Sequence, residues 1–555
     1  MEQTYDLTQG NIKRQLIYLS IPLLIGSIFQ QFYNTIDSII VGTYVGHDAF
    51  AAIGISGTVM NLFIFIIIGC CTGVSIITAQ LYGEKNYDKM RNEIFLSSIL
   101  GIVVTIIISI LGILFMPIIL NIIQTPVELT GYVTQYMNVI LGGLITTFLY
   151  NFLSSILRSV GNTRMSLIFL VISIFLNVIL DLLLIKQFSM GIMGAALATV
   201  ISQAVSALLC YFYIIYKIPF LKVKKIDMKY NSGLIRLTCQ YSFVSALHQS
   251  SLYIGKLLVQ GAVNSLGVDA ISAYTATGRI EDVILAFGNS GSEATSIFIA
   301  QNTGAKNQKR VLEGFKDALV LIQLVCIGLI LFIFFRSDIL LNFFSFDEGK
   351  TVLNYGVQYF KIISFFYIIS LVGSIFVGFY RGTGHVNIPV IGTTLQISIR
   401  VILSYLLVKF MGIGGVALAT GIGYFYPAKY VPSAELPDAE YPYILMTGRI
   451  LYHYTTRAMT GRTPELMEIA GKSFIEMNIK DADALGIKDG DKVRVASRRG
   501  EIETTAVVGT KVSPGETWMP FHFPDGNANW LTNAALDKFA KAPEYKVCAI
   551  KIKKA

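Results

Sequence analysis

Eleven apolar runs constrain this chain more than any other feature, because each is long enough to cross about 30 Å of hydrocarbon as a helix. Of the 555 residues, 54% are hydrophobic, and the mean hydropathy is +0.61. We therefore expect an all-α polytopic membrane protein over most of the chain. The runs lie at 16–42, 50–80, 94–116, 130–152, 166–186, 193–217, 236–262, 280–302, 317–335, 357–379 and 388–409.

Basic residues in the connecting loops predict the orientation. By the positive-inside rule, loops rich in Lys and Arg stay in the cytoplasm. Such loops follow every second run, whereas the opposite loops hold little beyond Lys186, Arg336 and Lys350. We expect a multi-pass protein of the cell (inner) membrane, in contact with the lipid bilayer, with its N-terminus in the cytoplasm. The residues on that side are Lys13, Arg14, Lys85, Lys89, Arg91, Arg158, Arg164, Lys217, Lys222, Lys224, Lys225, Lys229, Lys306, Lys309, Arg310 and Arg381.

The apolar part also repeats itself. The segment "VGHDAFAAIGISG" (45–57) matches "LGVDAISAYTATG" (266–278), and "AQLYGEKN" (79–86) matches "AQNTGAKN" (300–307), both at an offset of 221. Later, "LRSVGNTR" (157–164) matches "YRGTGHVN" (380–387), and "GIMGAALAT" (191–199) matches "GIGGVALAT" (412–420). Each repeat unit holds six spans, the last of which is cut short in the second unit. Because six is an even number, both halves have the same orientation in the membrane, which is a transporter architecture. A repeated structural bundle without a transport role is the alternative.

We name the two halves the N-terminal lobe (1–217) and the C-terminal lobe (218–424). Beyond them the composition changes. Charged residues number 45 in the first 425 positions and 34 in the last 130, and nine of the fourteen prolines follow residue 425. Net charge is +7 before this point (26 basic minus 19 acidic) and +2 after it (18 minus 16). Neither value indicates a nucleic-acid partner.

The repeated motifs resemble those of the multidrug and toxin extrusion (MATE) transporters. The resemblance covers residues 1–424 and rests on Pro22 with Gln30 and Gln31, the "HDA/VDA" loops, "AQ-x-x-G-x-K-N" and "R-x-x-G-N-T". It implies a secondary transporter, not an enzyme. Its activity would be antiport coupled to Na⁺ or H⁺ that exports drugs or organic, often cationic, small molecules, with no cofactor required.

Polar residues inside the apolar runs mark a candidate cation site, because intramembrane carboxylates are costly to bury. Asp37 lies in the first run, and Asn177 and Asp181 lie four residues apart on one face of the fifth. Thr199 falls at a similar depth. Oxygen ligands of this kind suit Na⁺, or a proton shared between carboxyl groups. The competing interpretation is that Asp181 caps its helix or reaches the interface.

The family resemblance implies the same site. It assigns the cation-coupling role to Asp37, Asn177 and Asp181, with Tyr136 and Thr199 as weaker members, and Asp37 and Asp181 as ligands if the ion is Na⁺. At the repeat offsets, the C-terminal lobe has Leu258, Arg400 and Ser404 at the first three positions. That lobe instead places Lys256 and Arg400 within its runs, so either these pair with unidentified partners or the substrate is less cationic.

After residue 426 the periodicity becomes that of a β domain. Residues 491–512 alternate like two half-buried strands joined by "SRRG", and residues 479–491 predict a short helix and a turn. About 130 residues suffice for one small soluble β-rich domain.

This tail resembles the molybdopterin dinucleotide-binding domain of molybdopterin oxidoreductases, and the formate dehydrogenase alpha subunit closely. The matching motifs are "TGR" (447–449), "YHY" (452–454), "MTGR" (459–462), "SRRG" (497–500), "MPFHF" (519–523), "NANWLTNAALD" (527–537) and "PEYK" (543–546). The resemblance implies a double-psi β-barrel over 441–555 that helps to hold molybdopterin guanine dinucleotide. Residues placed at the cofactor are Thr447, Gly448, Arg449, His453, His522, Asn529 and Lys546.

Two departures limit this reading of the tail. Thr455 stands where the family often has a second His. The iron–sulfur cysteines, the metal-ligating residue and most of the cofactor bed of such an enzyme have no counterpart here. We expect no redox catalysis from the tail alone.

The junction of the two parts lies at 425–440. "GVALATGIGY" begins like the sixth run but leaves only about 13 apolar residues from Met411, so we expect a truncated twelfth helix and a seam between Gly421 and Pro427. Three interpretations follow. The chain is a chimera of a transporter gene and a formate dehydrogenase fragment, a true fusion with a cofactor-sensing regulatory domain, or a membrane-tethered redox subunit.

Overall fold

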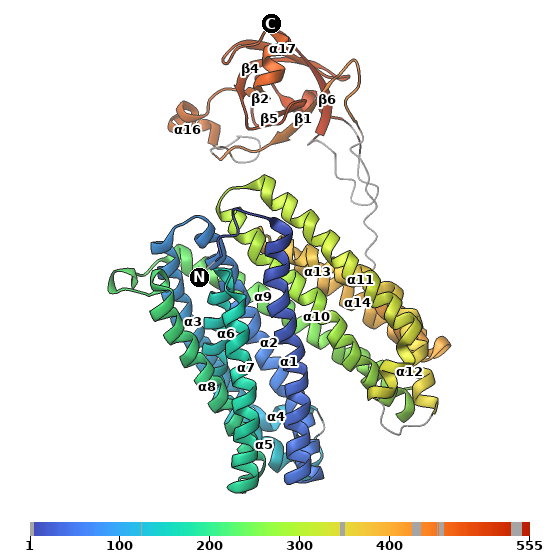
Figure 1. The fold of residues 1–555 in the computed structure, drawn as a ribbon. Helices are drawn as coiled ribbons and strands as arrows, with labels where there is room; N and C mark the ends of the chain where they lie inside the picture. Colours follow the sequence, from blue (N-terminus) through green and yellow to red (C-terminus); the bar gives the residue numbers. More distant parts are fainter. Residues whose placement is uncertain are drawn as a thin grey trace. The chain divides into compact units, whose positions relative to one another are not determined.

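The computed structural model describes residues 5–123, 125–344, 350–424, 435–451, 453, 460–533, 535 and 547–555. The chain divides into two compact units, Met1–Tyr426 and Pro427–Ala555, which we call the membrane unit and the barrel unit (Figure 1). The membrane unit is helical, and the barrel unit holds the β-strands. The fold class expected from the sequence is therefore confirmed.

Fifteen α-helices are described in the membrane unit. In the N-terminal lobe these are α1 (Ile12–Tyr44), α2 (His47–Gly83), α3 (Tyr87–Leu114), α4 (Met116–Ile122), α5 (Val127–Gly142), α6 (Leu144–Ser159), α7 (Thr163–Asp181) and α8 (Gly191–Lys217). In the C-terminal lobe they are α9 (Ser232–Asn264), α10 (Val268–Gly304), α11 (Gln308–Phe344), α12 (Lys350–Ile363), α13 (Tyr367–Gly382), α14 (Asn387–Met411) and α15 (Ile413–Tyr424).

All eleven apolar runs are helical, but the expected number of spans needs correction. Within the described residues, nine helices or continuous helix pairs are long and apolar enough to cross a membrane, and a bent pair makes ten. That pair is α5 and α6, which bend by 48° where one helix ends at Gly142 and the next starts at Leu144. The eleventh, α9, is 33 residues long but includes Arg236, His248 and Lys256, which lower its hydropathy.

Asparagine caps fix where several membrane helices begin. The side chains of Asn11, Asn86, Asn162 and Asn231 each accept a hydrogen bond from the backbone amide three residues later. This geometry satisfies an amide that the helix itself leaves without a partner. Two of these caps, Asn86 and Asn162, belong to the repeated motifs, which therefore have a local structural role.

Each lobe has its own hydrophobic core. One cluster gathers residues between Ile40 and Leu221, and the other gathers residues between Val259 and Ala417. Leu7, Leu16 and Leu19 belong to the second cluster, so the start of the chain packs against the C-terminal lobe.

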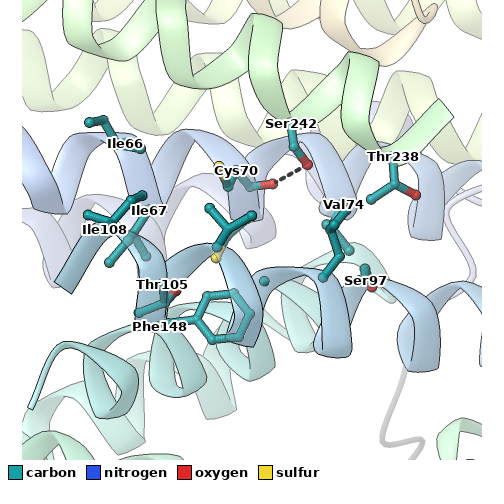
Figure 2. A pocket seen from close by; sticks show the side chains of 14 residues that line it. Ile66, Ile67, Cys70, Val74, Ser97, Thr105, Ile108, Phe148, Thr238 and Ser242 are labelled. Atoms are coloured by element: carbon teal, nitrogen blue, oxygen red, sulfur yellow. Dashed lines mark hydrogen bonds between the residues drawn. The ribbon is translucent and has the colours of Figure 1, made fainter. Parts of the chain in front are cut away.

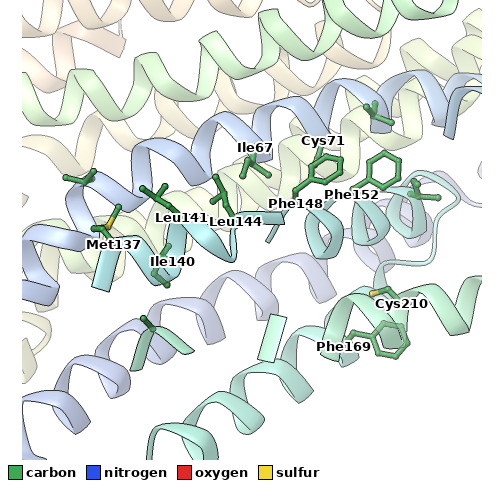
Figure 3. Packing of buried hydrophobic residues seen from close by; sticks show 14 of the residues in the cluster. Ile67, Cys71, Met137, Ile140, Leu141, Leu144, Phe148, Phe152, Phe169 and Cys210 are labelled. Carbon is green, nitrogen blue, oxygen red and sulfur yellow. The ribbon is translucent and has the colours of Figure 1, made fainter. Parts of the chain in front are cut away.

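Packing in the N-terminal lobe is tight. A cavity of about 50 Å³ lies among α2, α3, α6 and α9, lined mainly by apolar side chains such as Ile67 and Phe148 (Figure 2). Around it, Phe148 stacks on Phe152 with ring centroids 5.4 Å apart, beside Ile67 and Cys71 (Figure 3). Drug-sized ligands need pockets of roughly 300–1,000 Å³. This cavity is therefore not a substrate site for a molecule of that size.

The two lobes meet where α2 crosses α10. A Cβ on Gly83 would lie 1.9 Å from the carbonyl oxygen of Gln301, and one on Gly304 would lie 1.9 Å from that of Gln80. Gln80 Nε2 donates to the Gly382 carbonyl at 3.1 Å, and Gln301 Nε2 donates to the Ser159 carbonyl at 2.8 Å. The repeated "AQ-x-x-G" motif thus builds a symmetric contact between the lobes.

The barrel unit is a closed six-stranded barrel in the order β1-β5-β2-β4-β3-β6. Strands β1 and β5 pair in parallel, as do β2 and β4, and the other neighbours are antiparallel. The strands are β1 (Tyr443–Gly448), β2 (Phe474–Asn478), β3 (Lys492–Ala496), β4 (Glu501–Gly509), β5 (Glu516–Pro520) and β6 (Val547–Lys554).

The local predictions for the barrel are confirmed. Strands β3 and β4 form the expected antiparallel hairpin around "SRRG". The short helix α17 (Ile479–Leu485) ends at Gly486, whose φ of +65° favours glycine. Alternate residues such as Val493 and Val495 are fully buried, which is the pattern of a half-buried strand.

Candidate cation site and cofactor domain

Five residues from four helices converge in the N-terminal lobe. Asp37 comes from α1, Tyr136 from α5, Asn177 and Asp181 from the end of α7, and Thr199 from α8. All five side chains are buried. Asp181 is 0% exposed, and its side chain makes no capping hydrogen bond to the helical turn that follows it.

The two carboxyl groups, of Asp37 and Asp181, lie within hydrogen-bonding contact of each other. Each keeps one oxygen, Oδ1, that has no hydrogen-bond partner among the described residues. None of the ion pairs in the described part of the chain involves either carboxylate, and no basic side chain is among the groups that act on them. Two carboxyl groups in contact cannot both stay ionised without a compensating charge. A proton or a bound cation can supply that charge.

Asn177 and Thr199 complete the polar wall. The Asn177 amide is satisfied when its nitrogen donates to Asp181 Oδ2 at 3.0 Å and its oxygen accepts from the Thr199 amide at 3.1 Å. Tyr136 contacts Thr199 through its hydroxyl and lies near both carboxyl groups. The structure thus brings together every residue that the sequence suggested for this site.

Tyr33 also belongs to the cluster, although the sequence analysis did not include it. Its hydroxyl lies 3.2 Å from Thr199 Oγ1. Tyr33 precedes Asp37 by four residues and therefore shares its helix face. That spacing is the sequence signal that could have identified it.

The C-terminal lobe holds charged groups of both signs. Lys256 Nζ lies 2.9 Å and 3.1 Å from the two carboxylate oxygens of Asp282. Asp282, on the neighbouring helix α10, is therefore the partner that the sequence did not identify. The Lys256 side chain is half-exposed on α9. Arg400 Nε donates to Thr420 Oγ1 at 3.2 Å, and Glu281 lies in the same cluster.

The residues expected at a molybdopterin cofactor fall into two groups in the barrel unit. Arg449 and Asn529 are exposed and fit a role in binding an anionic cofactor. Arg449 rests over the ring of Phe521, with 6.0 Å to the centroid. Lys546 lies outside the described residues.

The other expected cofactor residues have interior roles. His453 contacts Thr460 Oγ1 at 3.1 Å and the Ala470 carbonyl at 2.6 Å, so both of its ring nitrogens are engaged. His522 Nε2 accepts from the Ile450 amide at 3.1 Å. Thr447 is also buried, and a Cβ on Gly448 would lie 2.7 Å from Trp518 Nε1. These residues make contacts within the barrel unit, and their placement at the cofactor stays a prediction.

A membrane unit of two repeated helical lobes, with a buried carboxyl pair in one of them, has the architecture of a secondary transporter. The comparison with known families is consistent with this. The chain belongs to the MatE family, whose model matches residues 22–183 and 245–406, one segment in each lobe.

Whole-length relatives support the same assignment. The chain is 26% identical to the probable multidrug resistance protein YpnP of Bacillus subtilis over 434 residues, covering 76% of this chain and 95% of that protein. An outward-facing MATE family multidrug transporter of the MOP superfamily has the same fold, with a TM-score of 0.72 at 21% identity over 76% of this chain and 95% of its own. A MOP superfamily transporter from Pyrococcus furiosus, described as having a binding pocket of reverse polarity, gives 0.71 at 21% identity and the same coverage.

The barrel unit has relatives of another kind. Residues 443–549 match the family model of the molydopterin dinucleotide binding domain. Over 134 residues, or 24% of its length, the chain is 50% identical to the F420-dependent formate dehydrogenase subunit alpha of Methanocaldococcus jannaschii. The chain spans only about a fifth of the length of that relative.

Proposed function

We propose that this protein is a cation-coupled antiporter that uses Na⁺ or H⁺ to export drugs or other organic, often cationic, compounds. The observation that carries the proposal is the buried contact between Asp37 and Asp181, which has no basic partner among the described residues. Membership of the MatE family supports the transporter part of the proposal.

The geometry suggests how ion binding acts on the fold. Asp37 is on α1, whereas Asn177 and Asp181 are on α7 and Thr199 is on α8. A cation held between these groups would draw three helices together, and its loss would leave two carboxyl groups that repel each other. Binding therefore favours one arrangement of the lobe over another, which is the requirement for coupling. In the orientation that we propose, with the N-terminus cytoplasmic, the cation enters from outside.

Ethidium efflux from energised membrane vesicles tests the proposal. With an imposed Na⁺ or H⁺ gradient, we expect the wild-type chain to drive efflux and Asp37→Asn to lose the dependence on the gradient. Leu258→Asn is the matched control, because Leu258 occupies the corresponding position of the C-terminal lobe and we expect it to remain active. Unchanged gradient-driven efflux in Asp37→Asn would contradict the coupling role of Asp37.

A second candidate function concerns the barrel unit. Its match to the dinucleotide-binding domain makes it a candidate to bind a molybdopterin guanine dinucleotide through Arg449 and Asn529. We propose no redox reaction for it. Molybdenum content of the purified chain and formate-dependent dye reduction test whether the barrel unit acts as part of a redox enzyme, and we expect both to be at background. A stoichiometric molybdenum content with dye reduction would establish the enzyme interpretation instead.

A further inference from the structure

The candidate cation site has a structural counterpart in the C-terminal lobe. At the repeat offsets, Tyr136, Asn177 and Thr199 correspond to Tyr359, Arg400 and Thr420. The helix pairs joined by these residues correspond as well. The side-chain oxygen of Asn177 accepts from the Thr199 backbone amide at 3.1 Å between α7 and α8, and Arg400 Nε donates to Thr420 Oγ1 at 3.2 Å between α14 and α15. Both lobes therefore build a polar cluster at the same place in the repeat.

The counterpart also contains two carboxyl groups, although neither is at the position of Asp37 or Asp181. Glu281 and Asp282 come from α10. Glu281 is 7% exposed, and its Oε2 accepts a hydrogen bond from the Tyr359 hydroxyl at 3.4 Å. Its other oxygen, Oε1, has no hydrogen-bond partner among the described residues. Burial opposes a charge on Glu281 unless a nearby cation compensates it.

Those cations belong to the chain itself. Lys256 forms an ion pair with Asp282, the neighbour of Glu281 on α10. Burial is the largest influence on Glu281 and opposes its charge, whereas Arg400 and then Lys256 favour it. Tyr274 also hydrogen-bonds Arg400 and so helps to hold its guanidinium in the cluster. The cluster therefore holds two carboxyl groups, one ammonium and one guanidinium. The guanidinium keeps its charge throughout the physiological pH range.

We propose that Arg400, assisted by Lys256, is a tethered cation that fills the role in the C-terminal lobe that an exchangeable ion fills in the N-terminal lobe. The chain then binds one exchangeable cation, in the cluster of Asp37 and Asp181, and none in the cluster of Glu281 and Asp282. The inference rests on the proposed coupling role of the N-terminal lobe. It adds the number of cations bound per chain and assigns a role to Lys256, Glu281 and Arg400, which lie outside the coupling site.

Substitution of Arg400 separates this role from simple packing. Arg400→Gln keeps a hydrogen-bonding side chain but removes the charge that compensates Glu281. The buried carboxylate must then take up a proton or a cation from solution. In the double variant Arg400→Gln with Glu281→Gln, both charges are gone, and the need for a second ion disappears. The double variant also tests whether any loss of stability in Arg400→Gln comes from the unpaired charge.

Equilibrium binding of radioactive Na⁺ to the purified full-length chain, with proton uptake followed by a pH indicator on the same samples, is the experiment. We expect one exchangeable cation per chain for the wild type, two for Arg400→Gln, and one again for the double variant. If Arg400→Gln fails to fold, we expect the double variant to restore the melting temperature.

Two results would overturn the tethered-cation role. One is a wild-type chain that binds two cations, one of which is lost in Glu281→Gln. The other is a folded Arg400→Gln variant that still binds one cation. If that variant is unfolded, failure of Glu281→Gln to restore its folding has the same meaning. Asp37→Asn provides the separate arm. Retained wild-type binding in that variant contradicts the proposed function in the N-terminal lobe, whereas the Arg400 and Glu281 variants decide the role of the C-terminal lobe.

Discussion

At the scale of single residues, the two lobes surround their buried carboxyl groups with different side chains. A carboxyl group buried in a membrane protein needs a compensating charge. In the N-terminal lobe Asp37 and Asp181 lie against each other, and hydroxyl and amide groups surround them. In the C-terminal lobe the compensating charges are supplied by Lys256 and Arg400.

Thr199 offers a residue-scale prediction, because it links several members of the site. Its hydroxyl lies 3.2 Å from the Tyr33 hydroxyl, and its backbone amide donates to the side-chain oxygen of Asn177 at 3.1 Å. Thr199→Val removes only the hydroxyl contact. We expect Thr199→Val to weaken cation binding by roughly five- to tenfold, as the loss of one net hydrogen bond of about 1 kcal/mol implies. Thr420→Val, at the corresponding position of the other lobe, should leave this affinity unchanged. Equal weakening by both substitutions would show a general packing effect.

At the scale of helices, the crossing of α2 and α10 connects the lobes. The glycines of the repeated motif allow backbone contact there, because a Cβ on Gly83 would meet a carbonyl oxygen at 1.9 Å. A backbone contact cannot yield in the way that a flexible side chain can. The motif that identified the repeat in the sequence therefore acts by excluding side chains from this crossing.

The prediction at this scale compares two glycines of the same helix. Gly83→Ala should separate α2 from α10 and lower the stability of the membrane unit by roughly 1–3 kcal/mol, as overpacking does. Gly57→Ala is the control, since a Cβ there would meet nothing within 4 Å. By helix propensity alone, alanine would stabilise either position by up to about 1 kcal/mol. Thermal unfolding of both purified variants measures the difference, and equal melting temperatures would argue against the close contact.

At the scale of the whole molecule, the membrane unit and the barrel unit are separate bodies with separate cores. Glu435 and Asp438, which the sequence analysis placed in the linker, form ion pairs with Arg498 of the barrel. Of the expected seam between Gly421 and Pro427, residues 421–424 form the end of α15, and residues 425–427 lie outside the described residues.

Two carboxylates of the barrel unit should make its stability sensitive to acid. The backbone amides of Tyr441 and Glu440, with the Arg498 guanidinium, hold the pKa of Asp438 below its usual range. Lys554 and the Lys488 amide do the same for the pKa of Asp491. A lowered folded-state pKa contributes stability that is complete above the unfolded value of about 3.9 and is lost as pH falls through the folded value.

We therefore expect the barrel to unfold progressively as pH falls below about 4, and the variant Asp438→Asn with Asp491→Asn to show a flatter dependence on pH. Tryptophan fluorescence measures this unit selectively, because both tryptophans, Trp518 and Trp530, lie in the barrel. Asp525→Asn, which changes an exposed carboxylate elsewhere on the barrel, is the control. An unaltered pH profile in the double variant would contradict the expectation.

Removal of the barrel tests whether the two units act together. We expect a chain of residues 1–426 to retain gradient-driven ethidium efflux, because the candidate cation site and its supporting contacts lie within the membrane unit. Lost efflux in a shortened chain that still folds and inserts would favour the regulatory-fusion interpretation. A folded chain is recognised by an unchanged melting temperature of the membrane unit.

The sequence by itself determined the helices, the twofold repeat, the change of composition after residue 425 and the β3–β4 hairpin. These features depend on local periodicity and on the order of residues, and both can be read within a single stretch of the sequence. It also predicted that Asp37, Asn177, Asp181, Tyr136 and Thr199 share one site, because their positions in the apolar runs and the family resemblance related distant segments.

Only the tertiary structure decided which side chains meet across helices and strands. It brought Tyr33 to Thr199, paired Lys256 with Asp282, and placed Glu281 beside Arg400. It also turned His453 and His522 into the interior of the barrel unit. Such contacts join residues that are far apart in the chain or on different elements, and they depend on how whole elements pack. Local patterns in a single sequence do not contain that information.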